Sequence, residues 1–500
     1  MRYLFLLILV CPLFLNAQFT VAPYFSDNMV LQRDEPIHVW GKAIPKSRIK
    51  VSFLNQTKYT IAQSDSGWDV YMTAEKANSK SNELVIESSS SKSVFKNVLV
   101  GDIWLCIGQS NMLFTMREEM HYKEEFKNAQ QSILRFYNPT YIGKDVYNAP
   151  FTDSMLQRLN YANFYSQVNW NISDSQSFRN MSAVGYYFGK ELVKDINIPI
   201  GLINLSIGGA PIETFINEAV YKKDSMVANK LNGNWLYNNA LPKWIRIRSL
   251  QNVGNVQNVP SNMYGPNHAF KPGFAYESGI KPLTKLPIKG IIWYQGESNS
   301  LEINDVEQYA YLQKIMIEDY RKQWNKRKLP FYWVQLSSID TITYQSKFWP
   351  QFREEQRRAM ENNKYTGMAV SSDIGLRNNV HPTNKKLVGY RLAQWALNKV
   401  YFKKVVPSGP LPLSAKYKNG KVLISFKYAN EGLFTSDNKS VTGFSLDGIS
   451  DCDAIIKKNN IVLNTETKPG YVYYSWKPYA IANLINKANL PTSTFKIKVK

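Results

Sequence analysis

Apolar and polar positions divide the chain into three parts. From Phe19 to about Phe95, short runs of β-branched and aromatic residues are separated by turn signals such as Asp65–Ser66–Gly67. After Pro407 a similar pattern returns. Both ends of the chain are therefore expected to form antiparallel β structure. The strands predicted there include Ile37–Trp40, Arg48–Phe53, Trp68–Tyr71, Val422–Phe426, Val441–Leu446 and Phe495–Val499.

Between these ends, short apolar runs alternate with longer helical patterns, which indicates βαβ units around a parallel sheet. The predicted strands are Ile103–Ile107, Gly201–Ile207, Gly290–Tyr294, Phe331–Leu336 and Met368–Ser371. The predicted helices include Ala183–Asp195, Val306–Trp324, Phe352–Asn362 and Lys385–Val400. The stretch Ser225–Pro272 is rich in Asn and Pro and is expected to form long loops over one end of the sheet.

The first 17 residues, MRYLFLLILVCPLFLNA, have the pattern of a secretory signal peptide that ends at Ala17. The expected division is thus a signal peptide over 1–17, an N-terminal β domain over 18–96, an α/β catalytic domain over 97–404 and a C-terminal β domain over 405–500. No later window is apolar enough to predict a transmembrane span. We expect export to the periplasm or the extracellular space. Whether the two β parts pack together is left open.

The charge and the cysteine content of the chain indicate which kinds of molecule it can bind. The 61 Lys and Arg against 39 Asp and Glu give a net charge of +22, but the basic residues are spread out and no nucleic-acid-binding motif is present. Outside the cytoplasm, such a charge suits anionic glycans or is simply a solvated surface. Of the three cysteines, Cys106 and Cys452 would remain after export and are expected to be thiols rather than a bridge. We infer no nucleic-acid partner and no obligate protein partner.

Polar clusters follow four of the predicted strands, where open parallel sheets bind their ligands. They are Gly108–Gln109–Ser110–Asn111–Met112, Ser206–Ile207–Gly208–Gly209–Ala210, Tyr294–Gln295–Gly296–Glu297–Ser298–Asn299, and Asp373–Ile374–Gly375 with His381. Together they supply what acyl transfer requires: a serine nucleophile, a base to take its proton, and donors for the oxyanion.

Only four histidines can serve as the base. His38 lies in the first β part, and His121 lies on a predicted helix that directs it away from the serine. His268 lies in the irregular stretch, is expected to line a substrate pocket, and is the second candidate for the base. His381 follows the last strand and is the predicted base. No ligand-spaced pair of histidines or cysteines indicates a metal, and no cofactor is expected.

The Gly-Gln-Ser-Asn-Met motif at 108–112, the Trp-Tyr-Gln-Gly-Glu-Ser-Asn motif at 293–299 and His381–Pro382 together resemble the sialate O-acetylesterase family of SGNH hydrolases. The resemblance extends over nearly the whole chain after residue 17. It implies a three-layer α/β/α catalytic domain that removes O-acetyl groups from sugars. The residues it implies are Ser110 as nucleophile, His381 as base, the N–H groups of Ser110 and Gly209 with the side chain of Gln295 or Asn299 as oxyanion donors, and Gln109, Glu297 and His268 as substrate-binding residues.

One departure from the family concerns the acid behind the histidine. SGNH hydrolases commonly carry Asp three residues before the histidine, but Asn378 occupies that position here. Asp373 could complete a triad only if its loop folds back, and otherwise the site is a Ser-His dyad. Beside the glycine pair, Ile207 and Ala210 replace an expected Trp and Thr, which would reshape the pocket.

The favoured function is therefore an exported serine esterase that deacetylates carbohydrates, with O-acetylated sialic acid as the expected substrate and an acetyl-enzyme intermediate. An esterase for acetylated xylan or another polysaccharide is the alternative within the same class. A non-catalytic glycan-binding surface protein is the alternative of another class.

Overall fold

The computed structural model describes residues 19–254, 256–342 and 344–500. The predicted signal peptide lies outside these residues. The N-terminal part is β structure, as predicted, and its strands pair antiparallel except where β2 (Val30–Gln32) pairs parallel with β8. Its other strands are β1 (Thr20–Val21), β3 (Ile37–Lys42), β4 (Arg48–Phe53), β5 (Gln56–Ile61), β6 (Gly67–Met72) and β7 (Asn78–Glu87).

Strand β8 (Lys92–Gly108) joins the N-terminal β part to the central sheet. Its first half pairs with β2 and β7, and its second half lies between β11 and β14. Every residue from Val98 to Gly108 is buried. The domain limit predicted at 96/97 thus falls inside one continuous strand, while the division into domains stays a prediction. Because β8 is paired along its length, the turn that follows Gly108 is held rigidly.

The central sheet has the order β10-β9-β11-β8-β14-β15-β16 and is parallel except for the edge pair β10–β9. Its strands besides β8 are β9 (Gln131–Tyr137), β10 (Asn171–Ser173), β11 (Ile200–Asn204), β14 (Gly290–Tyr294), β15 (Phe331–Gln335) and β16 (Thr366–Val370). The prediction of an α/β fold with a parallel sheet between β parts is confirmed. Strands β9 and β10 were not predicted.

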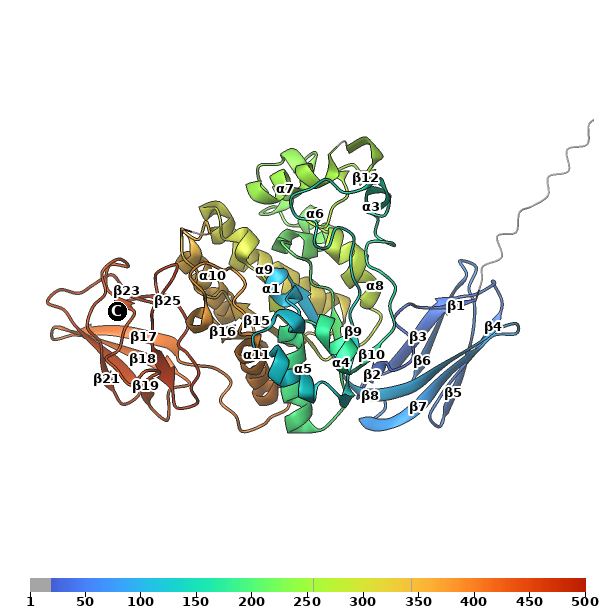
Figure 1. The fold of residues 1–500 in the computed structure, drawn as a ribbon, viewed down its shortest axis with the longest axis horizontal. Helices are drawn as coiled ribbons and strands as arrows, with labels where there is room; N and C mark the ends of the chain where they lie inside the picture. Colours follow the sequence, from blue (N-terminus) through green and yellow to red (C-terminus); the bar gives the residue numbers. More distant parts are fainter. Residues whose placement is uncertain (1–18, 255, 343) are drawn as a thin grey trace, which may run out of the picture.

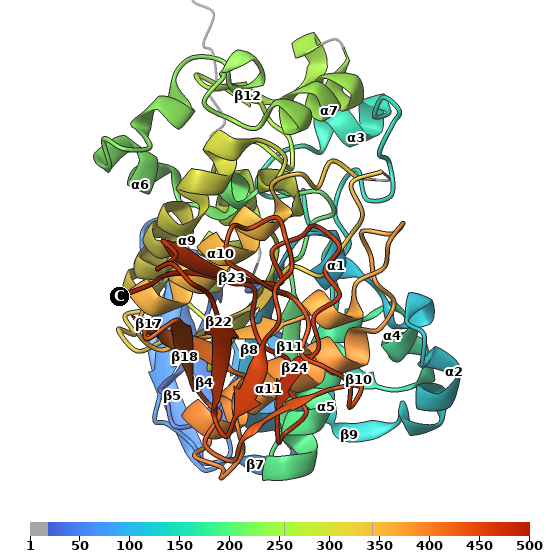
Figure 2. The same ribbon diagram turned by 90° about the vertical axis from the view of Figure 1, so that its left-hand side faces the viewer.

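Helices cover both faces of this sheet. Tyr332 stacks on Trp395 of α11 (Lys385–Lys399), whereas the next residue, Trp333, donates a hydrogen bond to the Gln356 carbonyl of α10 (Trp349–Asn362). Successive strand residues point to opposite faces, so α11 and α10 lie on opposite sides. Helix α5 (Ala183–Ile196) packs beside α11, and α9 (Ile303–Gln323) packs beside α10. Figures 1 and 2 show these two pairs around the sheet.

The C-terminal part forms a separate apolar core and lies on the opposite side of the α/β part from the N-terminal strands (Figure 1). The two β parts therefore do not form one unit. The strands are antiparallel: β17 (Leu411–Lys418), β18 (Lys421–Lys427), β19 (Leu433–Thr435), β20 (Phe444–Ser445), β21 (Ile455–Lys457), β22 (Asn460–Asn464), β23 (Tyr471–Tyr474), β24 (Leu484–Asn486) and β25 (Phe495–Lys498). Cys106 and Cys452 are free thiols, as predicted.

The stretch predicted as loops forms a cap with short elements of its own, gathered at the top of Figure 1. Its 11-residue helix α7 (Lys243–Val253) was not predicted. The cap also contains α3 (Asp153–Gln157), α6 (Glu218–Lys223), β12 (Ser261–Asn262) and β13 (Gly265–Pro266). The remaining short helices are α1 (Ser110–Leu113), α2 (Tyr122–Glu125), α4 (Ser175–Asn180) and α8 (Lys281–Leu283). Among the described residues, no helix combines the length and apolarity that crossing a membrane requires.

Candidate active site

Ser110 stands at a tight turn between the central strand β8 and helix α1. Gly108 has φ +135°, and a Cβ there would lie 2.1 Å from the Tyr294 carbonyl oxygen, so only glycine fits. Gln109 donates its backbone N–H to the same carbonyl at 2.9 Å. The turn thereby presents the Ser110 side chain at the carboxyl end of the sheet.

His381 reaches Ser110 from the loop before α11. The distance from His381 Nε2 to Ser110 Oγ is 2.8 Å. The Asn379 side chain accepts the His381 backbone N–H at 2.8 Å, and the Asn111 amide donates to the Val380 carbonyl at 3.0 Å. The sequence prediction paired these two residues across 271 positions, and the structure places them within hydrogen-bond distance.

The electrostatic surroundings keep His381 neutral. Burial, together with the nearby Lys385 ammonium and against the opposing effect of Glu118, lowers the pKa of His381 from 6.5 to about 4. A neutral imidazole with a bare Nε2 accepts the proton of Ser110 without first losing one of its own.

A buried polar chain lies beside the serine and histidine. Lys385 Nζ donates to Asn111 Oδ1, and Asn111 Nδ2 donates to Glu297 Oε1 at 2.5 Å. Burial lowers the pKa of Lys385 to about 7 and raises that of Glu297. Glu297 Oε2 has no partner among the described residues, and Glu297 lines the pocket. Glu297 thus lies in the wall of the pocket with one buried carboxyl oxygen unpaired, and its role in substrate binding stays a prediction.

Asp373 does not stand behind His381. Both of its carboxylate oxygens accept hydrogen bonds from Arg391, each at 2.7 Å. The loop does not fold back, because the guanidinium on α11 holds the carboxylate beside η9 (Ser372–Ile374). The triad expectation is therefore corrected: among the described residues, no carboxylate hydrogen-bonds to His381, and the arrangement is a Ser-His dyad.

Gly209 brings a backbone N–H to the same site. It has φ +72°, and a Cβ there would lie 3.0 Å from Phe270 Cζ and 3.1 Å from Trp244 Cη2. Ser298 Oγ donates to the Gly209 carbonyl at 2.8 Å and anchors the peptide that follows the Gly209 N–H. Among the described residues, the N–H groups of Gly209 and Ser110 have no acceptor, so both are available to an oxyanion.

Gln295 and Asn299 hold the wall behind this site instead of facing the pocket. Both are fully buried and neither lines the pocket. Gln295 Nε2 is surrounded by the acceptors of Gln109, Ala210 and Asn299, and Asn299 Nδ2 donates to Glu213. The prediction that either amide stabilises the oxyanion is corrected, because both amides are buried behind the pocket and donate to protein acceptors there.

The side chain of Gln109 is the amide that reaches the pocket. Its Oε1 accepts from Gln295 Nε2 at 3.1 Å, from Gly296 N at 3.3 Å and from Ser298 N at 3.2 Å. Three donors on one atom fix which end of the amide is oxygen. Gln109 Nε2 has no acceptor among the described residues, and the residue lines the pocket beside Ser110.

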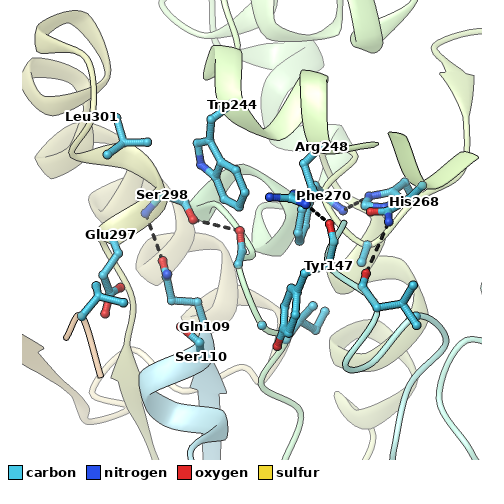
Figure 3. A pocket seen from close by; sticks show the side chains of 18 of the residues that line it. Gln109, Ser110, Tyr147, Trp244, Arg248, His268, Phe270, Glu297, Ser298 and Leu301 are labelled. Carbon is cyan, nitrogen blue, oxygen red and sulfur yellow. Dashed lines mark hydrogen bonds between the residues drawn. The ribbon is translucent and has the colours of Figure 1, made fainter. Parts of the chain in front are cut away.

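The pocket over Ser110 measures about 560 Å³ and is lined mainly by aromatic and aliphatic side chains (Figure 3). His268 belongs to its wall, as predicted, and stacks on Phe151. Burial lowers the pKa of His268 to about 3, so the ring is neutral. The sequence prediction missed Trp244 and Arg248, which α7 brings to the pocket. His38 and His121 lie elsewhere and contact Asp69 and Glu119.

Comparison with known proteins gives consistent results. Residues 268–398 match the family described as carbohydrate esterase, sialic acid-specific acetylesterase. The chain is 30% identical to the sialate O-acetylesterase of Pongo abelii, over 84% of this chain and 80% of that protein, and 29% identical to that of Homo sapiens over the same shares. A carbohydrate acetylesterase from Xanthomonas citri superposes with a TM-score of 0.77 at 27% identity, covering 96% of this chain and 99% of that one.

Proposed function

The chain belongs to the sialate O-acetylesterase family of carbohydrate esterases, and on this premise we propose that it deacetylates O-acetylated sialic acids through an acetyl-enzyme on Ser110. Its relatives are carbohydrate acetylesterases, so sugar deacetylation is the reaction. The observation that carries the mechanism is the 2.8 Å contact between Ser110 Oγ and His381 Nε2 at the floor of the pocket.

In the first half of the reaction, Ser110 Oγ attacks the acetyl carbonyl carbon while its proton passes to His381 Nε2. The tetrahedral intermediate collapses when the bond to the sugar oxygen breaks, and His381 returns the proton to that oxygen. The sugar leaves with a free hydroxyl group, and the acetyl group stays on Ser110. Water then attacks the acetyl-enzyme with His381 again as base, and acetate and the free serine are formed.

The negative oxygen of each tetrahedral intermediate needs fixed donors. We assign the backbone N–H groups of Ser110 and Gly209 and the side-chain Nε2 of Gln109 to this role. The Gln109 amide is oriented by three hydrogen bonds to its oxygen before substrate arrives. Such preorganised donors act only as charge develops on the oxygen, so they raise kcat and not merely affinity.

Replacing Gln109 with Glu should test this donor. The variant keeps an oxygen for Gln295, Gly296 and Ser298 but removes the Nε2 donor. Loss of one oxyanion donor typically costs about 10²–10³ in kcat, and the glutamate carboxylate adds repulsion of the developing oxyanion, so we expect a loss of at least that size. Steady-state kinetics on p-nitrophenyl acetate measures kcat and KM. A kcat within threefold of wild type would remove Gln109 from the oxyanion hole.

The low pKa of His381 predicts that the enzyme stays active at a lower pH than an ordinary histidine base would allow. Activity needs the neutral imidazole, so kcat/KM should fall only as the pH drops through about 4 and should stay level up to about pH 6. An unperturbed histidine would instead lose activity below 6.5. The profile is measured on p-nitrophenyl acetate, with spontaneous hydrolysis subtracted. A midpoint near 6.5 would show that burial and Lys385 do not act on His381 as described.

Acetate release from a pair of substrates tests the proposed substrate class. We expect kcat/KM for O-acetylated N-acetylneuraminic acid to exceed that for acetylated xylan fragments by at least about tenfold, which a difference of about 1.4 kcal/mol in transition-state binding supplies. Equal or greater release from xylan would favour the polysaccharide alternative. It would leave the serine mechanism untouched, because both substrates carry the same acetyl ester.

Export belongs to the same proposal. Residues 1–17 have the charge, apolar run and small terminal residue of a signal peptide, and the proposed substrate lies on glycans outside the cytoplasm. A mature protein that begins at Gln18, identified by N-terminal sequencing of the secreted or periplasmic fraction, would support it.

A further inference from the structure

Among the described residues, the pocket contains one Lys or Arg side chain although the protein is strongly basic. Of 61 Lys and Arg residues, Arg248 alone is among the described residues that line it, and Glu297 is the one acidic residue there. Burial raises the pKa of Glu297, which favours its neutral form. The positive charge that a substrate meets in the pocket is therefore concentrated at Arg248.

Helix α7 places Arg248 close to the oxyanion segment. Trp244 and Arg248 are four residues apart and so share one face of the helix. The Trp244 ring lies against Gly209, since a Cβ on Gly209 would be 3.1 Å from Trp244 Cη2. Arg248 follows four residues later, a rise of about 6 Å along the helix. Figure 3 shows both side chains on the same side of the pocket.

A second connection to the same segment comes through Tyr147. Arg248 Nη1 donates to the Tyr147 carbonyl and to Asn148 Oδ1. The Tyr147 hydroxyl in turn lies beside Gly208, where a Cβ would be 2.8 Å from it. The guanidinium is thus held on the wall of the same pocket that Ser110 and Gly209 line.

The rest of the guanidinium is available for a ligand. Among the described residues, Arg248 has no carboxylate partner, and its Nε and Nη2 have no hydrogen-bond acceptor. Next to it, Ser249 and the Phe270 N–H both contact His268 Nδ1, so His268 carries its proton on Nε2, which has no partner. This wall therefore offers donors and no competing acid. A planar guanidinium fork matches a carboxylate.

We propose that Arg248 binds the carboxylate of the acetylated sugar and thereby selects anionic sugars over neutral ones. The inference rests on the proposed function, because it needs a substrate that carries a carboxylate. It makes Arg248 a specificity-determining residue that has no part in the acetyl transfer.

The test uses O-acetylated N-acetylneuraminic acid and its methyl ester, in which one added methyl group removes the carboxylate charge, with released acetate as the readout. Wild-type enzyme should show a KM for the acid about tenfold below that for the methyl ester, since charge-assisted bonds to Arg are lost. Arg248→Gln should raise the KM of the acid about tenfold with kcat within about twofold, and should leave the methyl ester unchanged.

Arg246→Gln is the matched control, because Arg246 lies on the same helix, does not line the pocket and bonds to the Leu241 carbonyl. It should leave both KM values unchanged. Hydrolysis of p-nitrophenyl acetate should be the same in all three proteins, which shows that the acetyl-transfer site is intact.

Equal increases in KM for the acid and the methyl ester in Arg248→Gln would overturn the inference, since Arg248 would then only support the Tyr147 loop. It would also fall if wild type did not distinguish the two substrates. The proposed function fails differently: wild type would then release acetate from neither sialic acid derivative while still cleaving a neutral acetylated sugar.

Discussion

Replacing Ser110 with alanine should lower kcat for acetate release by about 10⁵-fold or more. Removal of the nucleophile from a serine protease costs about 2 × 10⁶ in kcat, because the covalent route is lost and only binding and oxyanion donors remain. The same logic applies here, since His381 has no other hydroxyl group within hydrogen-bond distance among the described residues.

Initial rates on p-nitrophenyl acetate and on O-acetylated sialic acid measure this loss. The variant should melt at the wild-type temperature, because Ser110 Oγ makes its one hydrogen bond among the described residues to His381. A folded variant that keeps more than a tenth of the wild-type rate would show that another group attacks the ester.

Replacing His381 with Gln should be almost as damaging, with an expected loss of about 10⁴–10⁶ in kcat. Glutamine can hydrogen-bond to Ser110 but cannot take its proton at any pH in the working range.

By contrast, Asp373→Asn should change kcat by less than tenfold, because Asp373 is bound to Arg391 and not to His381. Both variants are compared with wild type at about pH 6, where the neutral imidazole dominates.

The Asp373→Asn variant should also change the stability of the protein. Asp373→Asn leaves the Arg391 guanidinium with a weakened partner and should lower the free energy of unfolding by about 1–3 kcal/mol, which denaturant titration can measure. A loss of kcat above a hundredfold at unchanged stability would contradict the dyad and restore the triad.

The sequence predicted the central strands well because each is a short apolar run that ends in a distinctive polar cluster. Gly290–Tyr294 is found with the predicted limits, and in the N-terminal β part so is Arg48–Phe53. Strand β8 was predicted only in its second half, because its first half belongs to a different pattern and pairs in a different part of the protein. Continuity of a strand across two sheets is a tertiary property that local periodicity does not contain.

The site shows the same division between local and tertiary information. Ser110 and His381 could be chosen from the chemistry of strand ends alone. The roles of Asp373 and Gln295 could not, because each depends on a partner from a distant segment: Arg391 on α11 for Asp373, and Gln109 for Gln295. Asp373 is close to His381 in the sequence, but both of its carboxylate oxygens accept hydrogen bonds from Arg391, so it does not complete a triad.

The sequence did not predict the pocket wall that carries Trp244 and Arg248, because helix α7 has no clear helical pattern. Its sequence, KWIRIRSLQNV, mixes basic and apolar residues without a clear helical stripe, and Asn- and Pro-rich segments surround it. The helix is held by the cap that it belongs to, and it brings Trp244 and Arg248 to the pocket. The one feature of the sequence that could have indicated this helix face is the i, i+4 spacing of Trp244 and Arg248.

The most direct test of the central claim, that Ser110 activated by His381 carries the acetyl group, is active-site titration with a fluorophosphonate. The reagent forms a bond between phosphorus and an activated serine oxygen and releases fluoride. We predict one equivalent of label on Ser110, found by peptide mass spectrometry, and acetate release from O-acetylated sialic acid that falls in proportion to the labelled fraction. Label on another residue, or acetate release that persists in fully labelled enzyme, would contradict the account.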